Sequence, residues 1–195
     1  QYSVLNANYL QFTHWYEVLF GLYAYFLYIY FDFSGYCDCA IGTAKLFGIK
    51  LTENFNYPFI ATSIQDFWNR WHISLSQWCR DHIFFSFSKF LTKKFTNISM
   101  IYFSIFSMFV TFVILGIWHG AGLNWVCYGM YHGAGLSLFM AYRHFMLSSF
   151  EAIYEKMQMF IPYRVAMGIV TFNFVALGLI FSLSPVQIKL LWNIL

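Results

Sequence analysis

Charged residues are scarce in this sequence of 195 residues. Asp, Glu, Lys and Arg make up 10% of it, whereas a typical soluble domain is about 25% charged. Hydrophobic residues make up 60% of the sequence and include 25 Phe, 15 Tyr and 7 Trp. In a soluble protein most of these side chains would have to be buried away from water. So little polar surface cannot shield such a core from water. The composition excludes a water-soluble globular protein and predicts a membrane protein.

Basic clusters and paired cysteines are missing as well. The net charge is only +3, and no basic run alternates with aromatic residues, so no nucleic-acid partner is expected. The histidines and cysteines show neither CxxC nor HxxxH spacing, and no metal or haem site is expected. The sequence also contains no P-loop, dinucleotide fingerprint or Gly-x-Ser-x-Gly motif. The four cysteines, which lie in apolar sequence, are predicted to be packed thiols.

Long uncharged stretches predict several membrane-spanning helices in an all-α fold. Residues 95–142 contain no Asp, Glu, Lys or Arg. A spanning helix needs about 20 apolar residues, so two spans fit, at residues 98–118 and 123–142, with a glycine-rich bend between them. Residues 165–183 are also uncharged and predict a third span.

The N-terminal part is less regular. Residues 18–31 are uncharged and reach membrane length only when flanking polar residues are admitted, which predicts one further span. The amphipathic stretch that follows, residues 34–47, is expected to form a separate re-entrant or tilted helix buried in protein. Asp32 and Asp38 would then need a polar cavity or partners.

An amphipathic helix is predicted to follow the polar connection at residues 49–61. Thr62-Ser-Ile-Gln65 has the form of a capping box. At 100° per residue, an apolar stripe lies beside a polar one, and Asp66 and Arg70 are spaced for an ion pair. The apolar stripe contains Trp68, Trp71, Leu75 and Trp78, and the polar stripe contains Asn69, His72, Ser76 and Arg80. This pattern is typical of a helix at the membrane interface or along an aqueous cavity.

Basic residues indicate the orientation. The segments 89–97 and 143–164 flank the pair of spans and carry lysines and arginines. Two spans return the chain to the same side, so both segments are predicted to face the cytoplasm.

Three histidines lie where a charge would be costly in a membrane, which makes function the first hypothesis. His119 lies at the break between two apolar segments, and His72 lies in the amphipathic helix. The alternative for His119 is a structural imidazole bonded to a carbonyl at a helix end. His132 fits a packing role better.

Five motifs resemble the membrane-bound O-acyltransferase family. The branch that they resemble contains the bacterial teichoic acid D-alanyltransferases and the alginate and peptidoglycan O-acetyltransferases. The motifs are YFDFSGY at residues 30–36, ENFNYPF at 53–59, DFWNRWHISLSQW with Arg80-Asp81 at 66–81, GIWHG at 116–120 and TFNF at 171–174. The resemblance implies one multi-pass domain over residues 1–195 in the bacterial cytoplasmic membrane. Because family members are about twice as long, we expect a C-terminal fragment without the N-terminal helices.

The resemblance also implies a reaction. A small acyl group, acetyl or D-alanyl, would pass from a thioester donor to hydroxyls of a cell-envelope polymer such as alginate, peptidoglycan or teichoic acid. His119 matches the family's catalytic histidine and His72 a second functional one. Asn69, Arg70 and His72 are candidate oxyanion donors. The expected tunnel-lining residues are Trp68, Asn69, Arg70, Trp71, Arg80, Asp81 and Trp118.

The implied co-substrates and partners lie on both sides of the membrane. The donor, on the cytoplasmic side, would be the phosphopantetheine of an acyl carrier protein or acyl-CoA, with no tightly bound cofactor. The acceptor would be the envelope polymer itself or an extracytoplasmic acyltransferase partner, and lipid surrounds the protein. Two alternatives stay open: a transporter or channel with a path through Asp32, Asp38, His119 and His132, and a membrane scaffold without catalysis.

Overall fold

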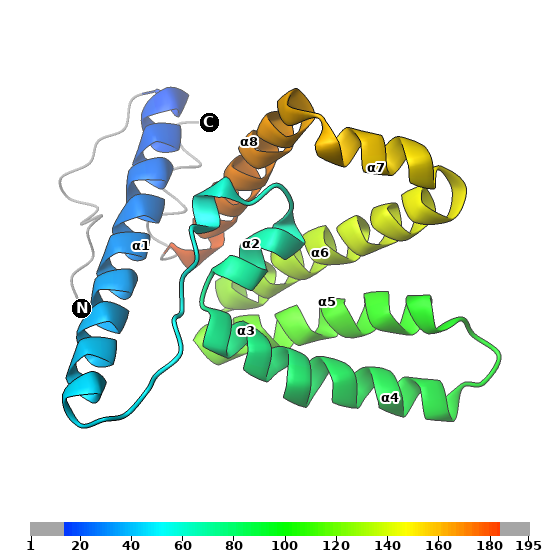
Figure 1. Cartoon of the computed structure of the whole chain (residues 1–195), viewed down its shortest axis with the longest axis horizontal. Helices are drawn as coiled ribbons and strands as arrows, with labels where there is room; N and C mark the ends of the chain where they lie inside the picture. Colours follow the sequence, from blue (N-terminus) through cyan, green and yellow to red (C-terminus); the bar gives the residue numbers. More distant parts are fainter. Residues whose placement is uncertain (1–13, 184–195) are drawn as a thin grey trace.

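The computed structural model describes residues 14–183, and expectations for residues 1–13 and 184–195 lie outside this part. The described residues form helices and no strand, apart from one isolated bridge between Phe55 and Trp71 (Figure 1). The all-α prediction is confirmed. The helices make an open arrangement in which α1 stands beside α8, while α4, α5 and α6 lie side by side.

The first helix is longer than predicted. Helix α1, Trp15–Leu46, runs without interruption for 32 residues, so the separate re-entrant helix expected at residues 34–47 is wrong. Gly35 does not break the helix, since a single glycine in a helix interior costs only about 1 kcal/mol relative to alanine. At about 1.5 Å per residue the helix is roughly 48 Å long, more than the hydrocarbon core of a bilayer requires.

The predicted amphipathic helix is broken in two. Helix α2 comprises Ile64–Arg70 and helix α3 comprises Ile73–Cys79. Between them Trp71 is extended and His72 is left-handed, with φ 43°. The prediction that Trp68, Trp71 and Trp78 share one helical stripe is therefore wrong. The N-cap is also one residue later than predicted, since the Ser63 hydroxyl accepts the N–H of Asp66.

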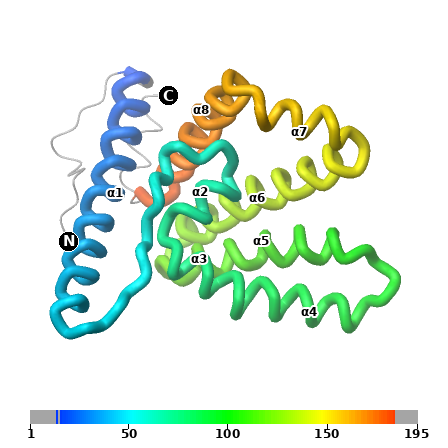
Figure 2. The backbone as a smooth tube through the Cα atoms, viewed as in Figure 1, coloured from blue at the N-terminus to red at the C-terminus, as the bar shows by residue number. Residues whose placement is uncertain are grey.

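A π-helical turn joins α3 to the next helix. Residues Arg80–Phe84 form this turn, and helix α4, Phe85–Lys94, continues from it without a loop. Short π turns are frequent at functional sites. The extended connection after α1 contains one short 3-10 turn, Pro58–Ile60. Figure 2 shows this connection running back alongside α1 before α2 begins.

Glycines form the seam of a helical hairpin. Helix α5, Met100–His119, packs antiparallel against helix α6, Leu123–Ser149. The bounds of α5 are close to those predicted for the first span, and α6 begins where the second was predicted but continues seven residues beyond its predicted end at residue 142. A Cβ on Gly116 would lie 2.3 Å from the carbonyl oxygen of Trp125, and one on Gly129 would lie 2.4 Å from that of Phe112. Only glycine permits such close backbone approach.

The C-terminal helices complete the core. Helix α7, Glu151–Met159, leads to helix α8, Ile161–Gly178, which ends in a 3-10 turn at Leu179–Ser182 and so confirms the span predicted at residues 165–183. Helix α8 packs between α1 and α6, and the hydroxyl of Tyr23 on α1 bonds the side-chain oxygen of Asn173. The buried core draws on α1, α2, α5, α6 and α8 and includes Phe26, Phe67, Trp68, Phe112, Leu136, Val175 and Ala176.

Three helices among the described residues are long and apolar enough to span a membrane: Tyr16–Leu46, Met100–His119 and Ile161–Ser182. The chain is thus a membrane protein. Helix α6 is long enough, but it is not in this group. This helix contains several glycines, Asn124 and His132, which make it less apolar and which contact neighbouring helices.

We predict that Gly129→Ala destabilises the α5–α6 hairpin. The added methyl group would meet the Phe112 carbonyl, and such overpacking costs about 1–3 kcal/mol. Thermal unfolding of the purified protein in detergent should show a lower Tm. Gly35→Ala is the matched control: it has no neighbour within 4 Å and should leave the Tm unchanged or slightly raised. Equal effects of the two substitutions would contradict the close packing of the seam.

Candidate active site

The helix break at residues 71–72 is held by an extended segment. The N–H of Asn56 donates to the carbonyl of Arg70 at 3.0 Å, and the N–H of Ile73 donates to the carbonyl of Asn54 at 3.0 Å. Phe55 lies between these two bonds and pairs with Trp71. A left-handed residue other than glycine is unfavourable by about 1 kcal/mol or more, so His72 needs this support.

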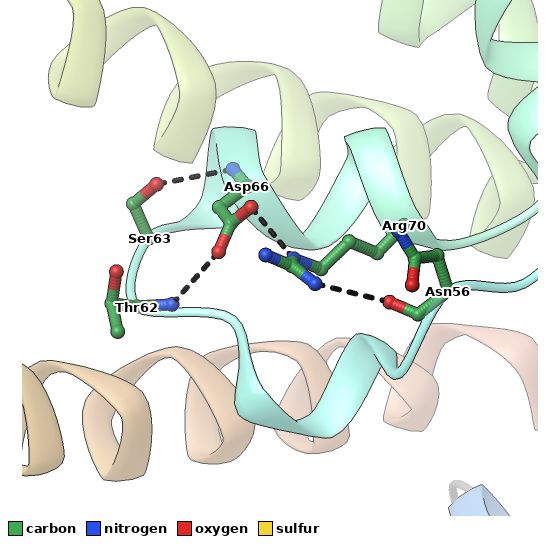
Figure 3. Close-up of polar contacts among 5 residues, drawn as sticks. All are labelled: Asn56, Thr62, Ser63, Asp66 and Arg70. Carbon is green, nitrogen blue, oxygen red and sulfur yellow. Dashed lines mark hydrogen bonds and ion pairs between the residues drawn. The ribbon is translucent and has the colours of Figure 1, made fainter.

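A polar cluster fixes the same segment to α2 (Figure 3). The predicted ion pair is present, with Arg70 Nε 2.7 Å from Asp66 Oδ1. The other carboxylate oxygen accepts the N–H of Thr62 at 3.3 Å, while Arg70 Nη1 donates to the carbonyl of Asn56 at 3.2 Å. Arg70, expected along a tunnel, is engaged in this cluster in the structure. Its guanidinium ties the connection before α2 to both ends of that helix.

His72 lies in a half-buried position beside Asn54. Its Nδ1 is 3.4 Å from Asn54 Oδ1, and its ring meets the ring of Phe33 edge to face at 4.7 Å. Burial lowers the pKa of the His72 imidazole below its usual value, and the nearby His119 lowers it further. The neutral form of His72 therefore persists to lower pH than in a free histidine.

His119 is the last residue of α5 and is exposed at the hairpin bend. Its Nδ1 lies 2.7 Å from the carbonyl oxygen of Leu115. A carbonyl can only accept, so Nδ1 carries the hydrogen and Nε2 keeps its lone pair in the neutral ring. The ring stacks on Trp125, with centroids 5.4 Å apart and planes 18° apart. The structural bond expected as an alternative role is thus present, and it leaves Nε2 free to act as a base.

A cavity of about 370 Å³ is lined by residues linked to the two histidines, although neither His72 nor His119 is among its lining residues. Ile73, which follows His72, lines it from one side, and Leu115, whose carbonyl holds His119, lines it from another. Three of the predicted tunnel-lining residues, Trp68, Asn69 and Arg80, are among its walls. The other residues that line the cavity are Gln65, Ile73, Ser76, Gln77, Cys79, Phe84, Met108, Thr111, Phe112, Leu115 and Leu136. The walls combine apolar surface with amides and hydroxyls.

The remaining predicted tunnel residues lie elsewhere. Trp71 packs in an aromatic cluster with Phe26 and Phe67, where it stacks on Phe67 at 5.5 Å. Trp118 is 65% exposed, and its ring lies nearly perpendicular to that of His119, with centroids 5.0 Å apart. Asp81 forms an exposed ion pair with Arg80, with Arg80 Nε 3.0 Å from Asp81 Oδ1.

His132 is completely buried behind the cavity wall. Its ring meets Trp68 edge to face at 5.3 Å and Tyr128 at 4.5 Å, and Tyr128 also contacts His119 at 5.8 Å. Neither ring nitrogen has a hydrogen-bond partner among the described residues. The close approach of Gly178 to Nε2 explains why a glycine stands in α8 at that point.

Sequence reasoning missed Asn54. Its Oδ1 accepts the hydroxyl of Ser74 at 2.7 Å and the N–H of Ser74 at 3.1 Å, besides facing His72. Two signals were available: Asn54 lies in the polar connection before the candidate histidine, and it belongs to the ENFNYPF motif at residues 53–59. Nothing in helical periodicity reports such a contact, because the two residues meet only after the helix breaks. Across residues 14–183, no three His, Cys, Asp or Glu side chains gather as a metal-binding group.

Comparison with known proteins adds a family match. The family described as MBOAT, membrane-bound O-acyltransferase family, matches residues 3–184. The chain is 44% identical over 110 residues to the teichoic acid D-alanyltransferase of Bacillus subtilis, covering 56% of this chain and 28% of that protein. It is 37% identical over 158 residues to the peptidoglycan O-acetyltransferase of Helicobacter pylori, covering 81% of this chain and 27% of that protein.

A third relative is the probable alginate O-acetylase AlgI of Pseudomonas aeruginosa. It is 42% identical over 106 residues, which cover 54% of this chain and 19% of that protein. The chain thus aligns with about a fifth to just over a quarter of the length of these relatives.

We predict that Asp66→Asn destabilises the protein by about 1–2 kcal/mol, because the partly buried ion pair with Arg70 and the bond to Thr62 both weaken. Thermal unfolding in detergent measures the effect. Asp81→Asn is the matched control, since its ion pair is about half exposed and exposed pairs contribute roughly 0.2–1 kcal/mol. An equal or larger loss of stability in Asp81→Asn would contradict the anchoring role of Asp66.

Proposed function

Because the chain belongs to the membrane-bound O-acyltransferase family, we propose that its parent protein transfers a small acyl group from a thioester donor to a hydroxyl of an envelope polymer. The observation that carries this proposal is the His119 site. A base is needed to take the proton of the attacking hydroxyl, and His119 holds its hydrogen on Nδ1 while Nε2 keeps its lone pair.

In the proposed step His119 acts first as a general base and then as a general acid. His119 Nε2 takes the proton of the acceptor hydroxyl while the oxygen attacks the thioester carbonyl carbon. The new C–O bond forms, the carbonyl oxygen becomes an oxyanion, and the C–S bond then breaks. The imidazolium of His119 returns its proton to the thiolate, so that an ester and a free thiol leave the site.

The oxyanion requires a donor near this centre. Of the three candidates, Arg70 is engaged by Asp66, and the Nδ1 of His72 faces Asn54. Asn69 is exposed and lines the cavity. Its amide N–H group is therefore the best placed of the three for this role.

The topology supports passage of the acyl group through the membrane. Helix α5 begins after the basic segment 89–97, which the positive-inside rule places in the cytoplasm, and His119 lies at its opposite end. We propose a multi-pass location in the bacterial cytoplasmic membrane. Donor thioester, on acyl carrier protein phosphopantetheine or coenzyme A, would enter from the cytoplasm, and polymer or an acyltransferase partner would receive the acyl group outside.

The acyl group is acetyl or D-alanyl, since the relatives include peptidoglycan and alginate O-acetyltransferases and teichoic acid D-alanyltransferases. The transporter alternative gains no support from the site. Asp32 and Asp38, which a transport path would have to enclose, are exposed on α1.

We predict that His119→Ala in the full-length parent protein lowers acyl transfer by about 10²- to 10⁴-fold, because the general base is lost. Membranes or liposomes containing the protein would be supplied in turn with radiolabelled acetyl and D-alanyl donors, and label in envelope polymer would be counted. The label that depends on His119 identifies the acyl group.

His144→Ala is the matched control. This histidine is exposed on the C-terminal half of α6, outside the cavity, and its loss should leave transfer unchanged. Undiminished transfer in a folded His119→Ala protein would remove His119 from the mechanism. Transfer of neither label by the wild-type protein would favour the transporter or scaffold alternatives.

A further inference from the structure

The amide of Asn54 has an orientation that its neighbours dictate. The backbone N–H of Ser74 can only donate, and it lies 3.1 Å from the Asn54 atom assigned as Oδ1. The other amide atom, Nδ2, faces the thiol of Cys37 at 3.6 Å. The oxygen of Asn54 therefore faces the helix break, and the NH₂ group faces α1.

This orientation determines the tautomer of His72. Asn54 Oδ1 has no hydrogen, so in a hydrogen bond across this 3.4 Å contact the His72 nitrogen is the donor. In the neutral ring, Nδ1 then carries the only ring hydrogen and Nε2 carries a lone pair. The backbone supports the same contact, because the carbonyl of Asn54 also accepts the N–H of Ile73, directly after His72.

We infer that Asn54 is a positioning residue that holds His72 as the Nδ1–H tautomer, so that His72 serves acyl transfer as a hydrogen-bond acceptor through Nε2. The inference rests on the proposed acyltransferase function and assigns a role within it. A neutral His72 of this kind orients an O–H or N–H group of the bound substrate. It cannot donate to the oxyanion, and that role passes to another group such as Asn69.

The charged and titratable groups around this contact come from three elements. At the end of α5, His119 interacts electrostatically with His72. On α1, Cys37 touches the Asn54 amide, and Asp38 acts electrostatically on that thiol. On the extended connection, Glu53 does the same. The contact between Asn54 and His72 itself holds no carboxylate, and burial lowers the pKa of the His72 imidazole, so the neutral form prevails near neutral pH.

Asn54→Asp tests the inference in the full-length parent protein. An aspartate keeps an acceptor oxygen for His72 but adds a negative charge, which raises the pKa of the imidazole. More His72 is then protonated at a given pH, and the protonated ring cannot accept at Nε2. We expect the acidic limb of the kcat/KM profile for acyl transfer to move to higher pH by roughly one unit or more.

Asn56→Asp is the matched control. It adds the same charge two residues away, on a residue that holds Arg70 through its backbone N–H and carbonyl. The acidic limb of this variant should coincide with that of the wild type. If Asn54→Asp leaves the limb in place, or if Asn56→Asp moves it equally, the inference is overturned.

The tautomer is measured separately from activity. Nitrogen-15 chemical shifts of the histidine-labelled protein distinguish Nδ1–H from Nε2–H, and the His72 signal is assigned as the one missing from His72→Gln. We expect Nδ1–H in the wild type and loss of this preference in Asn54→Leu. An Nε2–H signal in the wild type would overturn the inference. Absence of acyl transfer by the wild type would instead reject the proposed function, while the tautomer still decides the role of Asn54.

Discussion

The pairing of residues 54–56 with the break between α2 and α3 is the constraint on which the candidate site depends. Two backbone hydrogen bonds and one bridge contact hold an otherwise unfavourable left-handed histidine. The Asp66–Arg70 ion pair ties the same segment to the start and end of α2. The break between α2 and α3, and with it the position of His72, coincides with this pairing.

The hairpin of α5 and α6 supplies the second half of the site. Its glycine seam brings the two backbones close together, so that the ring of Trp125 on α6 stacks on His119 at the end of α5. Tyr128 then links His119 to the buried His132, and Trp68 packs on His132 from α2. A chain of aromatic rings thus connects the exposed base to the wall of the cavity. Rings have few rotatable bonds, and this arrangement holds the base with little loss of side-chain entropy.

The sequence predicted the elements whose causes are local. Uncharged length located α5, α6 and α8, and the spacing of Asp66 and Arg70 located their ion pair. Prediction from the sequence failed where tertiary contacts determine the local structure. Periodicity could not show that Trp71 leaves the helix to pair with Phe55, or that Ser34 and Gly35 stay within α1. Of the predicted tunnel residues, the structure brings Trp68, Asn69 and Arg80 to one cavity, whereas Arg70 and Trp71 pack elsewhere.

The π-helical turn at Arg80–Phe84 has a geometric consequence for the helices on either side of it. A π turn accommodates one residue more than an α-helical turn, and one residue corresponds to a rotation of about 100° about the helix axis. The face of α4 is therefore rotated relative to that of α3, although the helix continues without a loop. The stretch up to Arg80 borders the cavity with Ser76, Gln77 and Arg80. The following helix α4 packs Phe87 against Phe106 of α5. Deletion of one residue from this turn would restore the regular helix and turn α4 away from its neighbour.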